Sequence, residues 1–192
     1  MSSETVAVGR FTVRVKEDPD PLNPREKCDN LGAMICLHHK WALGDKHYYR
    51  EGDFESWDEL EARILKENPG AVILPLFLFD HGGLAMMTGP EQFRAQDAVG
   101  WDWGQVGFIY VGGEAIRAEY GAKRISRKLR RRVEDLLQAE VEEYDRYLRG
   151  EAYLYEVVGA SGEVVDSCGG FDRESDALAE GLGSAEAMMQ AA

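Results

Sequence analysis

The four histidines of the sequence stand near aspartates, in an arrangement that could hold a metal ion. Two or three imidazoles with a carboxylate can bind zinc or another divalent cation, which turns a bound water into a nucleophile near neutral pH. The candidate ligands are His38, His39, His47, Asp80 and His81. The spacing matches no strong metal motif, and adjacent residues of a strand point to opposite faces, so we expect at most one of His38 and His39 to join a site. Hydrogen-bonded or solvated histidines at strand ends are the interpretation we favour. We expect no cofactor, and a divalent metal is the one exception left open.

A second candidate site is the glycine-rich loop at Trp101. It places Trp101 and Trp103 on either side of Asp102, and Gln105 follows. Exposed aromatic side chains on loops are typical of protein interfaces and of platforms on which nucleic acid bases stack. If the loop folds over a sheet, both rings belong to the core instead. The sequence leaves these two interpretations open.

Basic residues gather in one segment of an acidic chain. The 192 residues include 35 acidic and 22 basic ones, a formal charge of −13, which disfavours nonspecific binding to nucleic acid or anionic lipid. Residues 114–132 nevertheless carry +6, whereas residues 133–192 carry −12. We call residues 123–132 the basic segment. Its predicted binding residues are Arg124, Arg127, Lys128, Arg130 and Arg131. They indicate a docking surface for an acidic partner or for nucleic acid phosphates, or else a solvated helix face neutralised by acids elsewhere in the fold.

The basic segment lies on the clearest helix that the sequence predicts. Apolar residues from Ile125 to Leu148 recur at spacings of three and four, which places them on one face. The helix is expected to begin at Ser126 or just before it and to end near Gly150. This helix is therefore expected to bury one face and to expose the other.

The remaining pattern predicts an α+β fold. Alternation and apolar runs indicate strands at 9–16, 31–38, 71–79, 106–111, 152–158 and 163–167. Further helices are expected at 56–68, 114–120 and 172–189, the first with a capping box at Ser56 and Glu59. Pro75 cannot donate to a ladder, so its strand must be an edge there or carry a bulge. We expect one globular domain over residues 1–192, with a mostly antiparallel sheet of about five or six strands, three or four helices, and a peripheral C-terminal helix at 171–192.

Composition excludes several classes of protein. The longest apolar run, 71–79, is far shorter than the roughly 20 residues of a membrane helix, so we expect no membrane partner. The N-terminus lacks the basic start and apolar stretch of a signal peptide, so we expect the protein in the cytoplasm.

The three cysteines, Cys28, Cys36 and Cys168, form no CxxC pair and are expected to be reduced thiols. Cys36 with a histidine and Asp102 could form a thiol hydrolase triad, but its apolar run favours a buried, inert thiol.

Several uncommon strings stand together in this sequence. They are Asp29-Asn30-Leu31-Gly32, Leu43-Gly44-Asp45-Lys46-His47, Leu74-Pro75-Leu76, Asp80-His81-Gly82, Trp101-Asp102 and Gly104-Gln105-Val106-Gly107-Phe108-Ile109-Tyr110. In this combination, over about residues 10–171, the chain resembles a family of small acidic proteins encoded by bacteriophages and plasmids. The resemblance implies a mobile-element accessory protein acting in the cytoplasm of a bacterial host, and it carries no established activity. Relatives often place a cysteine and a serine near Asp102, where this chain has Gly100 and Trp103, so we do not expect a nucleophile in that loop.

We therefore expect a non-enzymatic accessory binding protein that inhibits a host process such as a defence system, in the manner of an anti-CRISPR or anti-restriction protein. Its acidic surface could imitate the phosphates of DNA, and its expected partner is a host protein or nucleoprotein complex. A homodimer is left open. Two alternatives remain: a divalent metal-dependent hydrolase or nuclease that uses the histidines and aspartates, and a protein that binds nucleic acid directly through residues 123–132.

Overall fold

The computed structural model describes residues 4–191, which form two compact units. The terminal unit comprises the chain up to Asn23 and from Arg146 onward, and the central unit spans Pro24–Asp145. The terminal unit holds β1 (Glu4–Val8), β2 (Phe11–Glu17), β7 (Tyr153–Val158), β8 (Val164–Phe171) and α6 (Glu174–Gln190). The central unit holds α1 (Pro24–Lys27), β3 (Ala33–Cys36), α2 (Trp57–Glu67), β4 (Val72–Asp80), β5 (Leu84–Met87), α3 (Glu91–Gln96), β6 (Trp103–Val111) and α4 (Gly113–Glu119). Helix α5 (Arg127–Leu148) belongs to the central unit as far as Asp145.

The α+β class and the antiparallel pairing are confirmed, but the strands are divided between two sheets. Each sheet has four strands, in the orders β1-β2-β7-β8 and β3-β6-β4-β5, and the described residues form six helices. Strands β1 and β5 lie in segments with little alternation, which is why the sequence did not reveal them. The pairing of β2 with β7 joins segments about 140 residues apart, and no local pattern specifies such a pairing.

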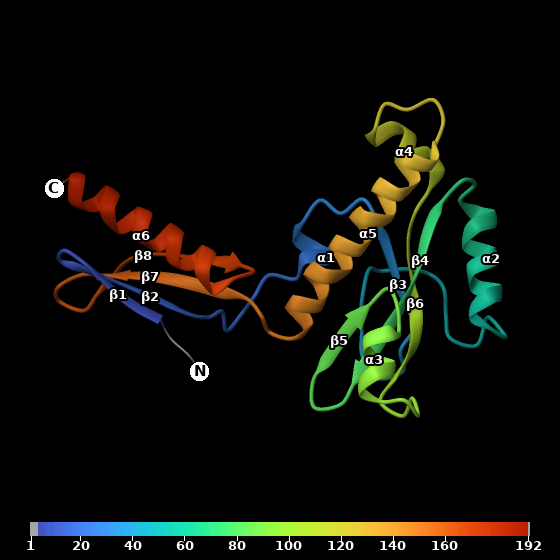
Figure 1. The fold of residues 1–192 in the computed structure, drawn as a ribbon, viewed down its shortest axis with the longest axis horizontal. Helices are drawn as coiled ribbons and strands as arrows, with labels where there is room; N and C mark the ends of the chain where they lie inside the picture. Colours follow the sequence, from blue (N-terminus) through green and yellow to red (C-terminus); the bar gives the residue numbers. More distant parts are fainter. Residues whose placement is uncertain (1–3, 192) are drawn as a thin grey trace. The chain divides into compact units, whose positions relative to one another are not determined.

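The sheet of the terminal unit is covered on one face by α6 (Figure 1). Alternate residues of β2, namely Phe11, Val13 and Val15, point into this core. They pack with Tyr155 and Val157 of β7 and with small residues of α6, including Ala177 and Ala185. The C-terminal helix was expected to be peripheral, but Ala177 and Ala185 of α6 are fully buried in this core, and the helix covers an apolar face that β2 and β7 would otherwise leave in water.

The sheet of the central unit is covered by helices on both faces (Figure 1). On one face Ile35 and Phe108, which are cross-strand partners, pack against Leu60 and Ile64 of α2. On the other face α5 approaches the chain closely, since a Cβ on Gly32 would lie 2.4 Å from Leu137 and 3.0 Å from Ile109. Burial on both faces explains why β6 is apolar almost throughout.

The predicted local features of α5, α2 and β4 are confirmed. The Ser126 hydroxyl accepts a hydrogen bond from the Leu129 N–H at the start of α5, and Gly150 follows its end with φ of +72°. Ser56 caps α2 by accepting from the Glu59 N–H. Strand β4 pairs with β5 only from Phe77 onward, so Pro75 lies where that side of the strand is free, next to a bulge at Leu76 and Phe77.

A buried arginine joins three parts of the central unit. The Arg25 guanidinium lies 2.6 and 2.9 Å from the two carboxylate oxygens of Asp45 and 2.9 Å from Glu140 of α5. Its side chain is 2% exposed. The Glu140 carboxylate also accepts the backbone N–H groups of Leu31 and Gly32. Every charge in this cluster is therefore paired and hydrogen-bonded, which is the condition under which buried charges are tolerated.

Within residues 4–191, none of the helices has the length and apolar character needed to cross a membrane. Cys28, Cys36 and Cys168 are not joined to one another in disulfides, as predicted.

Candidate functional site

Three chain segments meet at one edge of the central sheet. Strands β3 and β4 both run antiparallel to β6, so both end toward the start of β6: Cys36 pairs with Gly107, and Phe79 pairs with Trp103. The Asp80 N–H donates to the carbonyl of Asp102 at 2.8 Å. We call residues 38–41, 80–81 and 97–103 the aromatic edge. It brings together candidates that are far apart in the sequence.

Asp80 anchors one side of the aromatic edge. Its Oδ2 accepts a hydrogen bond from the indole N–H of Trp41 at 3.0 Å and lies 3.3 Å from the Lys40 ammonium. That ammonium lies 4.4 Å from the centre of the Trp41 ring. The hydrogen bond from Trp41, aided by Lys40, lowers the pKa of Asp80. Asp80 is thus held as a carboxylate by an aromatic and a cation at the surface.

His81 and Asp102 form a second pair there, with 3.2 Å between Nδ1 and Oδ2. A carboxylate on one ring nitrogen is the arrangement that orients a histidine general base. A hydrolase of the triad type would also need a nucleophile in contact with the other nitrogen. Among the described residues, no serine, threonine or cysteine hydrogen-bonds to His81. The pair lies at the surface, with the His81 side chain 72% and the Asp102 side chain 36% exposed.

The five candidate metal ligands are not gathered into a site. Across residues 4–191 no three His, Cys, Asp or Glu side chains are placed to hold a metal ion. His47 lies apart, with its ring nitrogens 3.1 and 3.0 Å from the carbonyl oxygens of Tyr49 and Cys36. His38 uses Nδ1 to accept the backbone N–H groups of Lys40 and Trp41. His38 and His47 are thus hydrogen-bonded beyond strand ends, as the favoured interpretation states.

The expectation that His38 and His39 point to opposite faces is wrong. Strand β3 ends at Cys36, so the two histidines lie in the turn beyond it, where their rings stack with centres 4.7 Å apart. Burial, together with the neighbouring His39, lowers the pKa of His38. His38 is therefore suited to accept hydrogen bonds as a neutral ring.

The two tryptophans of the loop have different environments. Trp101 is 85% exposed, and its neighbour Val99 is 77% exposed. Trp103 is half-buried, with its ring 6.1 Å from that of Phe77 and the Arg94 guanidinium 5.9 Å from its centre. Gln105 lies within β6. Trp101 thus fits the surface interpretation, whereas Trp103 is half-buried and packs against Phe77 without being part of the buried core.

Asp97 fixes the conformation of this loop. Its carboxylate accepts the backbone N–H groups of Val99 at 3.0 Å, Trp101 at 2.6 Å and Asp102 at 3.0 Å. Its carbonyl accepts the indole N–H of Trp103 at 2.8 Å. These N–H groups, that of Asp102 foremost, lower the pKa of Asp97. Sequence reasoning did not single out this residue, although an aspartate shortly before a glycine is a common sign of a side-chain-capped turn.

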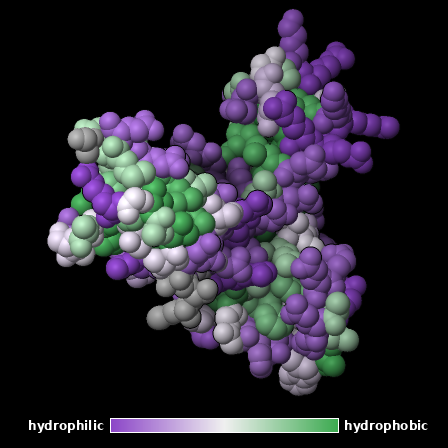
Figure 2. Space-filling model, turned by 60° about the vertical axis from the view of Figure 1, so that its left-hand side comes forward, coloured by the Kyte–Doolittle hydropathy of each residue, from purple (hydrophilic) through white to green (hydrophobic). Residues whose placement is uncertain are grey.

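The basic segment lies at the opposite end of β6, beyond α4 (Figure 1). The nine residues of β6 span about 26 Å at the rise of an extended strand. All seven cations of the segment are exposed, and hydrophilic side chains project there at the top of Figure 2. Within the described residues none of the seven forms an ion pair with a carboxylate; Arg130 donates to the Ala71 carbonyl, and Arg132 lies over the Tyr120 ring. The expected solvation of this helix face is therefore confirmed, but its positive charge is not neutralised by ion pairs with acidic residues of the described fold.

Cys36 is buried, and burial raises the pKa of its thiol to about 12. Because the thiolate is the reactive form, Cys36 is an inert core residue, as predicted.

No protein-family model, curated protein or solved structure matches the chain. The resemblance to phage and plasmid proteins therefore stays a prediction.

Proposed function

We propose that this protein is a non-enzymatic binding protein that docks on a partner protein through the Trp101 loop. The observation that carries this proposal is an 85% exposed tryptophan on a loop whose backbone is already held by Asp97. Tryptophans are among the residues that contribute most to protein interfaces. A loop that is ordered before binding loses little conformational entropy when the partner arrives.

Charge indicates the kind of partner. The central unit carries 22 acidic and 16 basic residues, and the terminal unit 13 and 6, so both are acidic. Complementary charge speeds association with a basic surface, including one that normally holds nucleic acid. Together with the resemblance to mobile-element proteins, this supports a host protein or nucleoprotein complex as the partner, and inhibition of a host process such as defence as the outcome.

The test starts with identification of the partner from bacterial lysate and continues with the purified pair. Hot-spot tryptophans contribute about 2 kcal/mol or more, so Trp101→Ala should weaken binding by about 30-fold. Leu22→Ala is the matched control, because Leu22 is also an exposed apolar residue, 64% accessible, but lies in the terminal unit. Its affinity should equal that of the wild type. A Trp101→Ala variant that is folded by circular dichroism and binds with full affinity would overturn the proposal.

A second candidate function is direct binding of nucleic acid through the basic segment. It is favoured by the seven exposed cations of the basic segment, none of which pairs with a carboxylate in the part of the chain that the structure describes. Charges are screened beyond about 8 Å at physiological salt, so this local charge can act despite the acidic remainder. Charge reversal of Arg127, Lys128 and Arg131 leaves the Arg130 contact with Ala71 intact.

Fluorescence anisotropy with a 20-nucleotide DNA or RNA measures this second function. Binding should weaken steeply between 50 and 200 mM salt and be lost in the triple variant. Reversal of Arg10 and Arg14 in the terminal unit is the control and should have little effect. Absence of binding by the wild type at 50 mM salt would exclude this function.

A further inference from the structure

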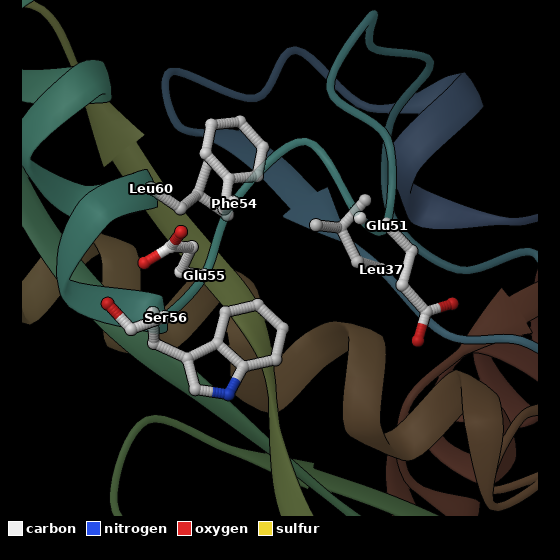
Figure 3. A pocket seen from close by; sticks show the side chains of 8 residues that line it. Leu37, Glu51, Phe54, Glu55, Ser56 and Leu60 are labelled. Atoms are coloured by element: carbon white, nitrogen blue, oxygen red, sulfur yellow. The ribbon is translucent and has the colours of Figure 1, made fainter.

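The central unit contains a pocket that neither proposed function uses. It lies between the end of β3, the loop before α2 and the first turn of α2, and has a volume of about 260 Å³. Figure 3 shows Leu37 and Glu51 on one side of it and Phe54, Glu55, Ser56 and Leu60 on the other. Gly52 and Trp57 complete the lining.

The walls of the pocket are aromatic and aliphatic. Phe54 and Trp57 contribute two rings, while Leu37 and Leu60 contribute methyl groups. The Trp57 ring is held in position by the core, because it packs edge-on against the ring of Phe108 with centres 6.3 Å apart. Helix α2 is in turn anchored by the buried Leu60 and by its Ser56 cap. These walls are therefore set by the core and exist before any ligand arrives.

The rim of the pocket is acidic. Glu51 and Glu55 both line it and are both exposed. In the described structure, neither carboxylate has an ion-pair or hydrogen-bond partner. The surrounding stretch 51–61 holds six acidic residues and no basic one. The rim therefore carries two carboxylates that form no ion pair among the described residues.

Arg63, the cation that contacts the Phe54 ring, forms no ion pair with the rim among the described residues. Arg63 lies 5.5 Å from the centre of the Phe54 ring, which shows that this ring already accepts a guanidinium over its face. The Arg63 Nε is 2.9 Å from Glu67, so its charge is paired there. His38, which Glu51 influences electrostatically, has its pKa lowered by burial and does not supply a charge at neutral pH.

We propose that this pocket binds the arginine or lysine side chain of a basic peptide segment of a partner protein. Aromatic faces attract guanidinium and ammonium groups, and the attraction grows as the group is desolvated. The methylene stem of such a side chain can lie along apolar groups while its head meets a carboxylate. Leu37 and Leu60 suit the stem, the two rings suit the cation, and Glu51 and Glu55 supply the opposite charge.

The test uses a short acetylated glycine-serine peptide with one central arginine, and the same peptide with citrulline, the neutral isostere of arginine. Binding is followed by NMR, through the Trp57 indole signal and the amides of residues 51–60. The arginine peptide should shift these signals in a saturable way, and the citrulline peptide should bind at least about tenfold more weakly. Raising the salt concentration should weaken binding of the arginine peptide only.

Two variants with the same change in charge locate the site. Glu51→Gln with Glu55→Gln removes both rim carboxylates and should weaken binding about tenfold. Asp58→Asn with Glu61→Gln removes two charges outside the pocket lining and should leave binding nearly unchanged. Trp101→Ala should bind the peptide like the wild type, which separates this site from the Trp101 loop.

Three results would overturn the proposal. Equal binding of the citrulline peptide would show an apolar pocket without charge recognition. Equal weakening by the two double variants would show a diffuse acidic field. Absence of shifts at millimolar arginine peptide would show that the pocket does not bind this group.

Discussion

The carboxylate of Asp97 accepts the backbone N–H of Trp101 at 2.6 Å, while the Trp101 side chain itself is 85% exposed. One residue thus fixes the backbone from which the most exposed tryptophan of the central unit projects. Gly100, with φ of +79°, permits the turn between them. The loop is ordered by polar contacts and not by burial of its aromatic ring.

Asp97→Ala should loosen this loop without disturbing the sheet. The N–H groups of Val99, Trp101 and Asp102 would lose a charged acceptor, so their amide exchange should accelerate by at least about tenfold. Asp97→Asn keeps one carbonyl oxygen as an acceptor, so its amide exchange rates should lie between those of the wild type and those of Asp97→Ala. Unchanged exchange in Asp97→Ala would show that the loop is held by other contacts.

Arg25→Ala should be strongly destabilising. It would leave the carboxylates of Asp45 and Glu140 without their shared cation, and breaking a buried pair in this way costs about 3–5 kcal/mol. The measurement is the free energy of unfolding in urea. Glu140→Gln is the milder comparison, because its amide oxygen can still accept the N–H groups of Leu31 and Gly32. An Arg25→Ala variant whose free energy of unfolding stays within about 0.5 kcal/mol of the wild type, as for an ordinary surface substitution, would show that the cluster does not stabilise the central unit.

Two glycines of α6 should respond to alanine with opposite signs. A Cβ on Gly181 would lie 2.7 Å from Val13 and 3.0 Å from Tyr155. Gly181→Ala should therefore overpack the core and lower the free energy of unfolding by about 1–3 kcal/mol. A Cβ on Gly183 meets nothing within 4 Å, so Gly183→Ala should stabilise the helix by about 0.5–1 kcal/mol. Chemical unfolding followed by circular dichroism compares the two. Stabilisation by both substitutions would contradict the seating of α6 on β2 and β7.

Glu67 should give the central unit an acid-dependent stability. Hydrogen bonds from the hydroxyls of Tyr48 and Tyr49, with one from Arg63, lower the pKa of Glu67 to about 2. The unfolded chain should titrate this group near 4.3. Because the folded pKa is the lower one, the stabilisation is present above about pH 4.3 and is lost as the pH falls toward 2.

Unfolding in urea at several pH values tests this dependence. The difference in stability between the wild type and Glu67→Gln should be largest near neutrality and should narrow on acidification. Tyr48→Phe should raise the pKa of Glu67 in an NMR titration, because it removes one donor. A stability difference that stays constant down to pH 2 would contradict the lowered pKa.

Features that depend on near neighbours in the chain could be predicted. The apolar spacing of α5 placed Val133, Leu137 and Val141 on its buried face, and the alternation of β2 placed Val13 and Val15 in a core. Pro75 correctly indicated a free edge and a bulge. Each of these follows from helix or strand geometry over a few residues.

The sequence indicated candidate residues for the sites but not their exposure or their partners. The exposure of Trp101, as opposed to Trp103, depends on which ring meets Phe77 of a different strand. The pairing of His81 with Asp102, and of Asp80 with Trp41, depends on the antiparallel order by which β3 and β4 both end beside the first half of β6. Asp97 acts through backbone N–H groups. Nearly every residue has one, so residue types do not reveal which of them a side chain will bind.

The sequence by itself determined the α+β class, the amphipathic helix, the buried thiol of Cys36 and the charge that divides into a basic segment and acidic flanks. Only the tertiary structure decided that the strands form two sheets, that no three candidate ligands within residues 4–191 are placed to hold a metal ion, and that Phe54 and Trp57 line a pocket with an acidic rim. The physical reason is distance along the chain. Periodicity and charge are properties of neighbouring residues, whereas sheet order, exposure and pockets arise from contacts between segments that the sequence keeps far apart.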